Sequence, residues 1–131
     1  MSTVLDQIQF EKQGGLVPAV VQDVNTKDVL MMGFMNRDAL QMTLDKKLVT
    51  FWQRSRSKLW TKGETSGNVL KFVSFRINCN DDSLLIMAEP VGPTCHTLHP
   101  TCYYREATVD ASDWNTITEA QGDPEAVYGN K

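Results

Sequence analysis

Cysteine and histidine are scarce in this sequence of 131 residues, and long apolar runs are missing from it. The three cysteines are an odd number without a secretory signal, which disfavours a disulfide framework and indicates a reducing compartment. No stretch approaches the roughly 20 apolar residues of a membrane span, and the start MSTVLDQIQF has neither a basic region nor an apolar core. We therefore expect a cytoplasmic protein that has no membrane partner.

An excess of basic residues is also missing. The 13 Lys and Arg stand against 16 Asp and Glu, for a net charge of -3, and no basic stripe is present. Binding to a nucleic acid polymer is therefore not expected. The length suits a single domain over residues 1–131, large enough to bury a core without disulfides.

Most of the chain has the composition of β-strands. The apolar segments 16–24 and 28–35 flank the turn residues NTK, which predicts a hairpin. We predict a mainly β fold, with α+β as the fallback, in which compact antiparallel sheets form a pseudo-barrel or sandwich. Four further strand-like runs are separated by Gly, Asn, Asp and Pro: residues 48–54, 68–78, 83–90 and 101–109.

One short helix is predicted near residues 37–46. Asn36 can cap its start, Asp38 lies in its first turn, and two lysines follow in its last turn. The segment from about 110 to 131 is polar, with scattered aromatic residues and no clear period. We expect this tail to be loosely packed.

The stretch GPTCHTLHPTC, residues 92–102, contains two of the three cysteines and both histidines. With Cys79, the thiolates of Cys95 and Cys102 could bind one Zn²⁺ and leave a fourth position open for water. A closed structural site of three cysteines and one histidine fits the spacing equally well. His96 directly follows Cys95, which suits proton transfer beside the metal better than ligation, and a hydrogen-bonding surface imidazole is an equal alternative.

The block NCNDD, residues 78–82, carries oxygen ligands next to Cys79. If the preceding strand stays extended, alternation places Cys79 on one face and Asn78, Asn80 and Asp82 on the other. The side chains of Asn78, Asn80, Asp81 and Asp82 offer oxygen ligands that could bind Mg²⁺ or Ca²⁺. Because few of the polar residues in the block are charged, a turn is the better interpretation of the residues alone.

Residues 53–68, QRSRSKLWTKGETSGN, combine basic side chains with hydroxyls and glycines. Such a mixture can bind a phosphorylated small molecule, although a solvated loop is its commoner role and no nucleotide-binding fingerprint is present. Trp60 could stack on a base or cap the core. The candidate substrate-binding residues are Arg54, Arg56, Trp60, Lys62, Glu64, Ser66 and Gly67.

Taken together, GLVPAVVQD, VLMMGFMN, RSRSKLWTKGETSGN, the Cys79 block and GPTCH followed by Cys102 closely resemble the phosphoribosyl-AMP cyclohydrolase family of histidine biosynthesis. The resemblance runs in order from about Gly15 to Tyr104. It implies an intertwined homodimer with one Zn²⁺ per subunit at the subunit interface. Cys79 of one chain and Cys95 and Cys102 of the other would bind this ion.

The resemblance also implies an enzyme, a cyclic amidine hydrolase. Its reaction breaks the N1–C6 bond of the adenine ring in 1-(5-phosphoribosyl)-AMP and gives the formimino-carboxamide ribotide. His96 would be the catalytic proton-transfer residue, and the substrate would be a small phosphoribosyl nucleotide.

This sequence departs from the family at a second metal site. The family binds Mg²⁺ with the three aspartates of a D-C-D-x-D block, which align with Asn78, Asn80 and Asp82, so we expect weak Mg²⁺ binding or weaker activity. Gln53 and Leu98 are further departures. Two alternatives therefore stay open, a diverged paralogue with a different purine-like substrate and a non-enzymatic, zinc-stabilised dimer. The segment DPEAVY resembles the start of a pyrophosphohydrolase domain that is often fused to this family, and we expect that domain to be absent.

Overall fold

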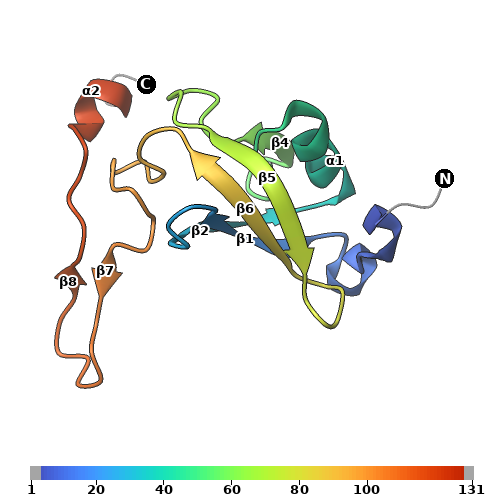
Figure 1. Cartoon of the computed structure of the whole chain (residues 1–131), viewed down its shortest axis with the longest axis horizontal. Helices are drawn as coiled ribbons and strands as arrows, with labels where there is room; N and C mark the ends of the chain where they lie inside the picture. The colour runs from blue at the N-terminus through green and yellow to red at the C-terminus, as the bar shows by residue number, and fades with distance from the viewer. Residues whose placement is uncertain (1–3, 129–131) are drawn as a thin grey trace.

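The computed structural model describes residues 4–128 and has one four-stranded sheet at its centre (Figure 1). The mainly β prediction is confirmed, and no helix within these residues is long and apolar enough to cross a membrane. The elements are the 3₁₀ helices η1 (Val4–Gln7) and η2 (Phe10–Gln13), the α-helices α1 (Arg37–Lys46) and α2 (Pro124–Tyr128), and the strands β1 (Val17–Asp23), β2 (Val29–Met35), β3 (Thr50–Gln53), β4 (Lys58–Thr61), β5 (Leu70–Ile77), β6 (Leu84–Pro90), β7 (Arg105–Glu106) and β8 (Asn115–Thr116).

The central sheet has the strand order β2-β1-β6-β5 and joins two hairpins that are distant in the sequence. Strands β1 and β2 pair antiparallel, as do β5 and β6, but β1 and β6 run parallel. The expectation of antiparallel pairing throughout is wrong at this contact, because the chain through α1, β3 and β4 is long enough for a parallel crossover. Two further antiparallel pairs, β3 with β4 and β7 with β8, stand apart, and no closed barrel forms within residues 4–128.

Helix α1 begins and ends at the predicted residues. The Asn36 Oδ1 atom accepts a hydrogen bond from the Ala39 N–H at 2.8 Å, and Lys47 ends the helix in the left-handed conformation, with φ of 61°. The buried Thr43 hydroxyl donates to the Ala39 carbonyl at 2.9 Å and accepts from the Thr50 N–H at 2.9 Å. The bond from Thr50 fastens the helix to β3, and the bond to Ala39 lies within the helix.

The core gathers side chains from the sheet, from α1 and from β3. Val17, Ala19 and Val21 of β1 are all fully buried, which is the alternation expected of a strand with one face on the core. Strand β3 packs closely on β2, because a Cβ atom on Gly33 would lie 2.6 Å from the Phe51 ring. Any larger residue at position 33 would push the two strands apart.

Strand β4 lies where the sequence indicated only a loop. Residues 54–57 reverse the chain tightly between β3 and β4, with Ser57 at a φ of 47°. Phe51 and Trp60 are paired across the two strands, and their rings stack with centroids 6.1 Å apart. Trp60 therefore packs at the edge of the core while part of its indole stays accessible.

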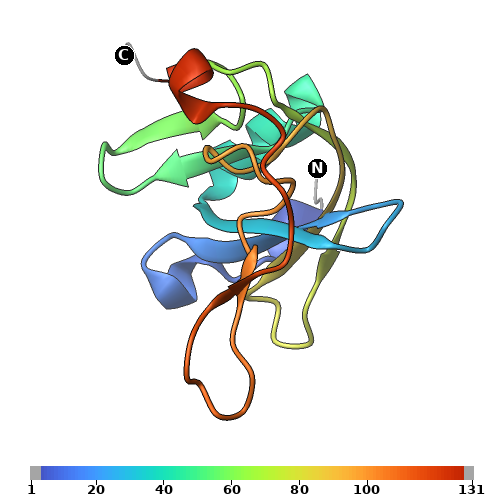
Figure 2. The same ribbon diagram turned by 90° about the vertical axis from the view of Figure 1, so that its left-hand side faces the viewer.

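After β6, residues 91–104 form a loop that docks on the start of β2. The Cys102 N–H donates to the Leu30 carbonyl at 2.8 Å. The chain then extends outward as the β7–β8 ribbon, visible in Figures 1 and 2, and returns along the same loop, where the Gln121 N–H donates to the Leu98 carbonyl at 2.7 Å. The strand predicted over 101–109 is reduced to the two residues of β7, because the preceding residues bind the edge of β2 instead.

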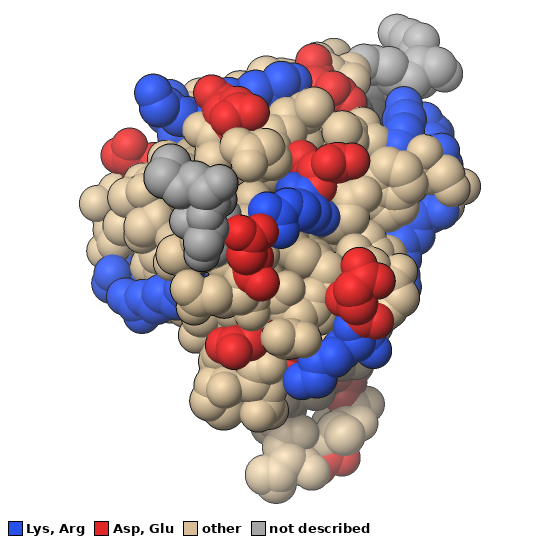
Figure 3. Space-filling view, turned by 90° about the vertical axis from the view of Figure 1, so that its right-hand side faces the viewer, with Lys and Arg blue, Asp and Glu red and all other residues tan. Residues whose placement is uncertain are grey.

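The side of the molecule that carries η1 and η2 has acidic and basic side chains interspersed (Figure 3). Two ion pairs tie this N-terminal segment to the rest of the chain. Arg37 Nη2 lies 2.6 Å from Asp6 Oδ1, and Lys12 Nζ lies 3.4 Å from Asp82 Oδ2. The second pair joins η2 to the turn between β5 and β6.

Candidate active site

Cys95 and Cys102 lie next to one another in the loop that docks on β2. Cys95 is 5% exposed, and the Thr97 hydroxyl donates to its sulfur at 3.0 Å. Burial raises the pKa of the Cys102 thiol to about 12, and the adjacent Cys95 thiol adds to the rise. All three cysteines are free thiols. A buried thiol beside a second thiol whose pKa is raised resists ionisation unless a cation joins them, so this pair fits a thiophilic dication such as Zn²⁺.

A pocket of about 460 Å³ opens beside this thiol pair. The Lys62 side chain enters it and is only 6% exposed. Burial lowers the pKa of Lys62, while the nearby Cys102 and Cys95 thiols act in the opposite direction. The Lys62 ammonium and the Cys102 thiol therefore face the same pocket, and the Cys95 thiol lies behind Cys102. The lining residues are Met31, Trp60, Lys62, Gly63, Thr65, Ser66, Thr94, His96 and Cys102.

The loop between β4 and β5 forms one wall of the pocket. Gly63 has a φ of +85°, and a Cβ atom there would lie 2.5 Å from the Asn68 backbone, so only glycine fits without moving the loop. The Gly67 N–H donates to the Gly63 carbonyl at 2.8 Å, and the Ser66 hydroxyl accepts from the Asn68 N–H at 3.2 Å. These bonds hold Ser66 at the wall.

The predicted substrate-binding residues divide into two groups. Trp60, Lys62 and Ser66 line the pocket, whereas Glu64 and Gly67 belong to the same loop but do not line it.

Arg54 and Arg56 lie outside the pocket. The Arg54 guanidinium sits 4.0 Å from the centroid of the Phe34 ring and borders a second hollow of about 600 Å³. This hollow shares Met31 and Trp60 with the first pocket. Arg56 is exposed in the β3–β4 turn. A ligand that passed across Trp60 would meet Lys62 at one end and Arg54 at the other.

The two histidines have separate positions. His96 lines the pocket, and its Nδ1 atom is 4.0 Å from the Cys95 sulfur. His99 stacks on Tyr104, with ring centroids 3.8 Å apart, and its Nδ1 atom is 2.7 Å from the Thr118 hydroxyl. His96 is therefore available to a ligand, whereas His99 joins the loop to the tail.

Sequence reasoning gave no site role to Thr94 and noted Gln53 only as a departure from the family. Thr94 is 1% exposed, and its hydroxyl has no hydrogen-bond partner within the described residues. The Gln53 Oε1 atom is also buried without a partner there, and Gln53 lines the second hollow. Buried polar atoms are normally satisfied, so both mark positions for a ligand or water. No spacing or composition signal in the sequence identifies either one.

Residues 78–82 form a turn, as the residues alone indicated. The Asn78 N–H donates to the Ser83 carbonyl at 3.1 Å, the Asp81 N–H donates to the Asn78 carbonyl at 3.1 Å, and Asp81 has a φ of 60°. The extended path that would have separated Cys79 from its neighbours by strand alternation is therefore wrong. The register of β5 also slips between Phe72 and Ser74, which breaks the alternation earlier in the strand.

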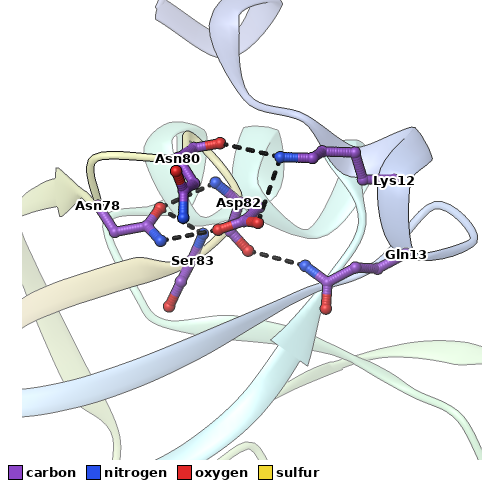
Figure 4. A network of polar contacts seen from close by, with 6 residues as sticks. All are labelled: Lys12, Gln13, Asn78, Asn80, Asp82 and Ser83. Atoms are coloured by element: carbon purple, nitrogen blue, oxygen red, sulfur yellow. Dashed lines mark hydrogen bonds and ion pairs between the residues drawn. The ribbon is translucent and has the colours of Figure 1, made fainter.

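The polar groups of this turn bind one another (Figure 4). The Asn78 Oδ1 atom accepts from the N–H groups of Asp82 and Ser83, at 2.8 and 2.9 Å, and its Nδ2 donates to Asp82 Oδ1 at 2.7 Å. This last bond is the main cause of the lowered pKa of Asp82, to which Lys12 also contributes. Mg²⁺ requires about six oxygen ligands in a nearly octahedral shell, and the side-chain oxygens of Asn78 and Asp82 are already engaged. The turn does not fit this cation.

Cys79 belongs to the same turn, which precedes β6, whereas Cys95 belongs to the loop that follows it. Figure 1 shows this turn and this loop at opposite ends of β6. The seven residues of β6 extend over about 20 Å at the usual rise of a strand. Within residues 4–128, no three His, Cys, Asp or Glu side chains converge closely enough to hold a metal. One chain therefore presents two separate parts, the Cys95–Cys102 thiol pair and Cys79.

The mainly β framework places a thiol pair, an imidazole and a buried ammonium around one pocket. This set of groups indicates a small-molecule hydrolase more than it indicates a binding module. The chain belongs to the phosphoribosyl-AMP cyclohydrolase family, whose model, described as PRA-CH, matches residues 31–104. The family resemblance noted in the sequence is confirmed.

Individual relatives agree with this membership. The chain is 43% identical over 123 residues to the phosphoribosyl-AMP cyclohydrolase of Desulfatibacillum aliphaticivorans, covering 93% of this chain and 97% of that protein. It is 45% identical over 128 residues to the phosphoribosyl-AMP cyclohydrolase of Chlorobium chlorochromatii, covering 98% and 92%. It is 52% identical over 105 residues to the histidine biosynthesis bifunctional protein HisIE of Photobacterium profundum, covering 80% and 51%. The chain thus spans about half the length of the bifunctional relative.

Proposed function

We propose that this chain hydrolyses the N1–C6 bond of the adenine ring in 1-(5-phosphoribosyl)-AMP, as a zinc-dependent, cytoplasmic homodimer of histidine biosynthesis. The observation that carries the proposal is the convergence of the thiol pair, His96 and Lys62 on one pocket in a member of this family. Each of these groups has a use in adding water to a phosphorylated purine.

Zinc would be held by Cys95 and Cys102 of one chain and Cys79 of a second copy. The separation of these cysteines along β6 supports sharing between chains, since no single chain can place all three on one ion. Val73 and Ile77 of β5, which are 48% and 41% exposed, add apolar surface near Cys79 that a second chain can cover. When bound, zinc lowers the pKa of a water ligand and makes it a nucleophile near neutral pH.

His96 handles protons in this proposal. Water adds to C6, the N1–C6 bond breaks, C6 becomes the carbon of a carboxamide, and the departing N1 needs a proton. The His96 imidazole can accept a proton from the attacking water and return it to N1. Among residues 4–128, it is the only histidine that lines the pocket.

The two hollows match a substrate with a phosphate at each end. Lys62 supplies a positive charge in the first and Arg54 in the second, and Trp60 between them offers a face for the purine. The unpartnered Thr94 hydroxyl can bind a polar atom of the substrate beside the thiol pair. The chain's own residues thus bind and orient the ring.

Zinc analysis and turnover of 1-(5-phosphoribosyl)-AMP test the proposal directly. His96→Asn should lower kcat at least a hundredfold, the usual size of a general acid–base contribution of about 10²–10⁴. His99→Asn is the matched control and should keep nearly full activity, because His99 faces the tail. A zinc-loaded protein that fails to open the ring at saturating substrate would refute the proposal.

A diverged paralogue with a different purine-like substrate is the second candidate. The amide-closed turn at Asn78 favours it, since this turn departs from the family's cation site. This candidate predicts no turnover of 1-(5-phosphoribosyl)-AMP and no gain when Asn78→Asp and Asn80→Asp are combined. Turnover by the unaltered chain would eliminate it.

A further inference from the structure

We propose that the Lys12 ammonium takes the place of a divalent cation at the turn that carries Cys79, so that the chain positions Cys79 without Mg²⁺. Lys12 is thus a positioning residue. The inference rests on the proposed function, because only that function gives Cys79 a role in a shared site.

Lys12 reaches the turn from η2 and contacts it at two points (Figure 4). Its Nζ atom lies 3.4 Å from Asp82 Oδ2 and 3.3 Å from the Asn80 carbonyl oxygen. One ammonium therefore joins a carboxylate and a backbone carbonyl on either side of Asp81. A bound cation would make the same kind of contacts.

Two further hydrogen bonds attach the same N-terminal segment to the turn. The Gln13 Nε2 atom donates to the Asp82 carbonyl at 2.9 Å, and the Gln9 N–H donates to the Asp81 carbonyl at 2.7 Å. The residues before and after Lys12 in the chain, Gln9 and Gln13, are therefore both bound to the turn. The segment over residues 9–13 is a clamp on the turn.

The three positions that carry the family's aspartates keep one carboxylate here, that of Asp82, and Asp81 adds a second carboxylate to the turn. Three aspartates at positions 78, 80 and 82 would repel one another and would need a cation of high charge. Here Asn78 instead donates its Nδ2–H to Asp82, a bond that a carboxylate cannot make, and the ammonium neutralises the one remaining carboxylate of the three. A Mg²⁺ ion would have to displace both the amide and the ammonium from Asp82.

The first test compares zinc-loaded full chains that carry Lys12→Met, Lys12→Arg or, as a matched surface control, Lys71→Met. The measurement is the rate of zinc transfer to a chromophoric chelator. Lys12→Met should speed transfer about two- to fivefold, the size expected of an exposed ion pair. Lys12→Arg should restore the slow rate, and Lys71→Met should not change it. Equal rates for Lys12→Met and Lys71→Met would overturn the proposal.

The second test measures the thermal midpoint with and without millimolar Mg²⁺. The unaltered chain should show no shift, whereas the combination of Lys12→Met, Asn78→Asp and Asn80→Asp should gain a Mg²⁺-dependent rise. A rise in the unaltered chain would overturn the proposal. The proposed function is refuted by a different result, a zinc-loaded chain that does not open the ring. That result does not depend on the thermal midpoints.

Discussion

Two variants that are each inactive should regain activity when their chains are mixed, because Cys79 and the thiol pair would serve a shared site from different subunits. In Cys79→Ala, every site of the dimer lacks the ligand from the β5–β6 turn. In Cys102→Ala, every site lacks one thiol of the pair. A mixed dimer instead contains one site with all three cysteines, built from the undamaged part of each chain.

The size of the recovery follows from the geometry. Since β6 separates Cys79 from Cys95 by about 20 Å, a chain cannot complete a site with its own residues. Random exchange makes half of the dimers mixed, and one of the two sites in each mixed dimer is complete. The mixture should therefore recover about one quarter of the turnover of the unaltered protein.

The assay dissociates equal amounts of the two variants, reassociates them with zinc, and measures turnover and zinc content per chain. A mixture of Cys95→Ala and Cys102→Ala is the matched control, because both changes damage the same part of the site, and it should recover nothing. Full activity of Cys79→Ala alone, or equal recovery in both mixtures, would refute the shared site. Zinc recovery without turnover would instead favour a non-enzymatic, zinc-stabilised dimer.

Three further predictions concern single residues. Lys62→Met should raise KM for the phosphorylated substrate about tenfold to a hundredfold, the value of a charge-assisted hydrogen bond, and Lys71→Met serves as its surface control. In the metal-free protein, thiolate absorbance should show one group that ionises near pH 12, and this group should be lost in Cys102→Ala. The same thiol ionises nearer pH 9.0 in the unfolded chain. Its contribution therefore makes the free energy of unfolding fall as pH rises from about 9 towards 12. Thr43→Val should lower the free energy of unfolding by about 1–3 kcal/mol in chemical denaturation, since the buried Thr50 N–H loses its acceptor. Thr26→Val is the exposed control, and a smaller loss of stability in Thr43→Val than in this control would contradict the role of Thr43.

Local signals predicted the elements that depend on neighbours in the sequence. Asn36 and the lysines after Leu44 fixed the bounds of α1, because capping acts within one turn of a helix. The hairpin of β1 and β2 followed from two apolar runs around a turn. The parallel pairing of β1 with β6 could not be predicted in this way, since it depends on a crossover of about 60 residues.

The candidate site also contains residues that local sequence signals predicted and residues whose position depends on contacts between distant segments. Cys95, Cys102 and His96 share one short loop, so their spacing was informative. The burial of Lys62 and the unpartnered Thr94 hydroxyl arise from contacts between segments, and neither residue type indicates such a position by itself. The alternation expected up to Cys79 failed because β5 slips in register and because the Asn78 side chain accepts hydrogen bonds from the Asp82 and Ser83 N–H groups, which close a turn there.

The amides at Asn78 and Asn80 allowed two consequences, weak Mg²⁺ binding or weak activity, and the proposed role of Lys12 would separate them. A free cation holds the turn only in proportion to its concentration, whereas Lys12 is attached to the chain and held beside Asp82 by Gln9 and Gln13. Its effective concentration at the turn is therefore high and does not depend on the medium. If Lys12 acts as proposed, the loss of the family's carboxylates would remove a metal requirement and leave Cys79 in position, so low Mg²⁺ affinity and full ring-opening activity would be compatible in this chain.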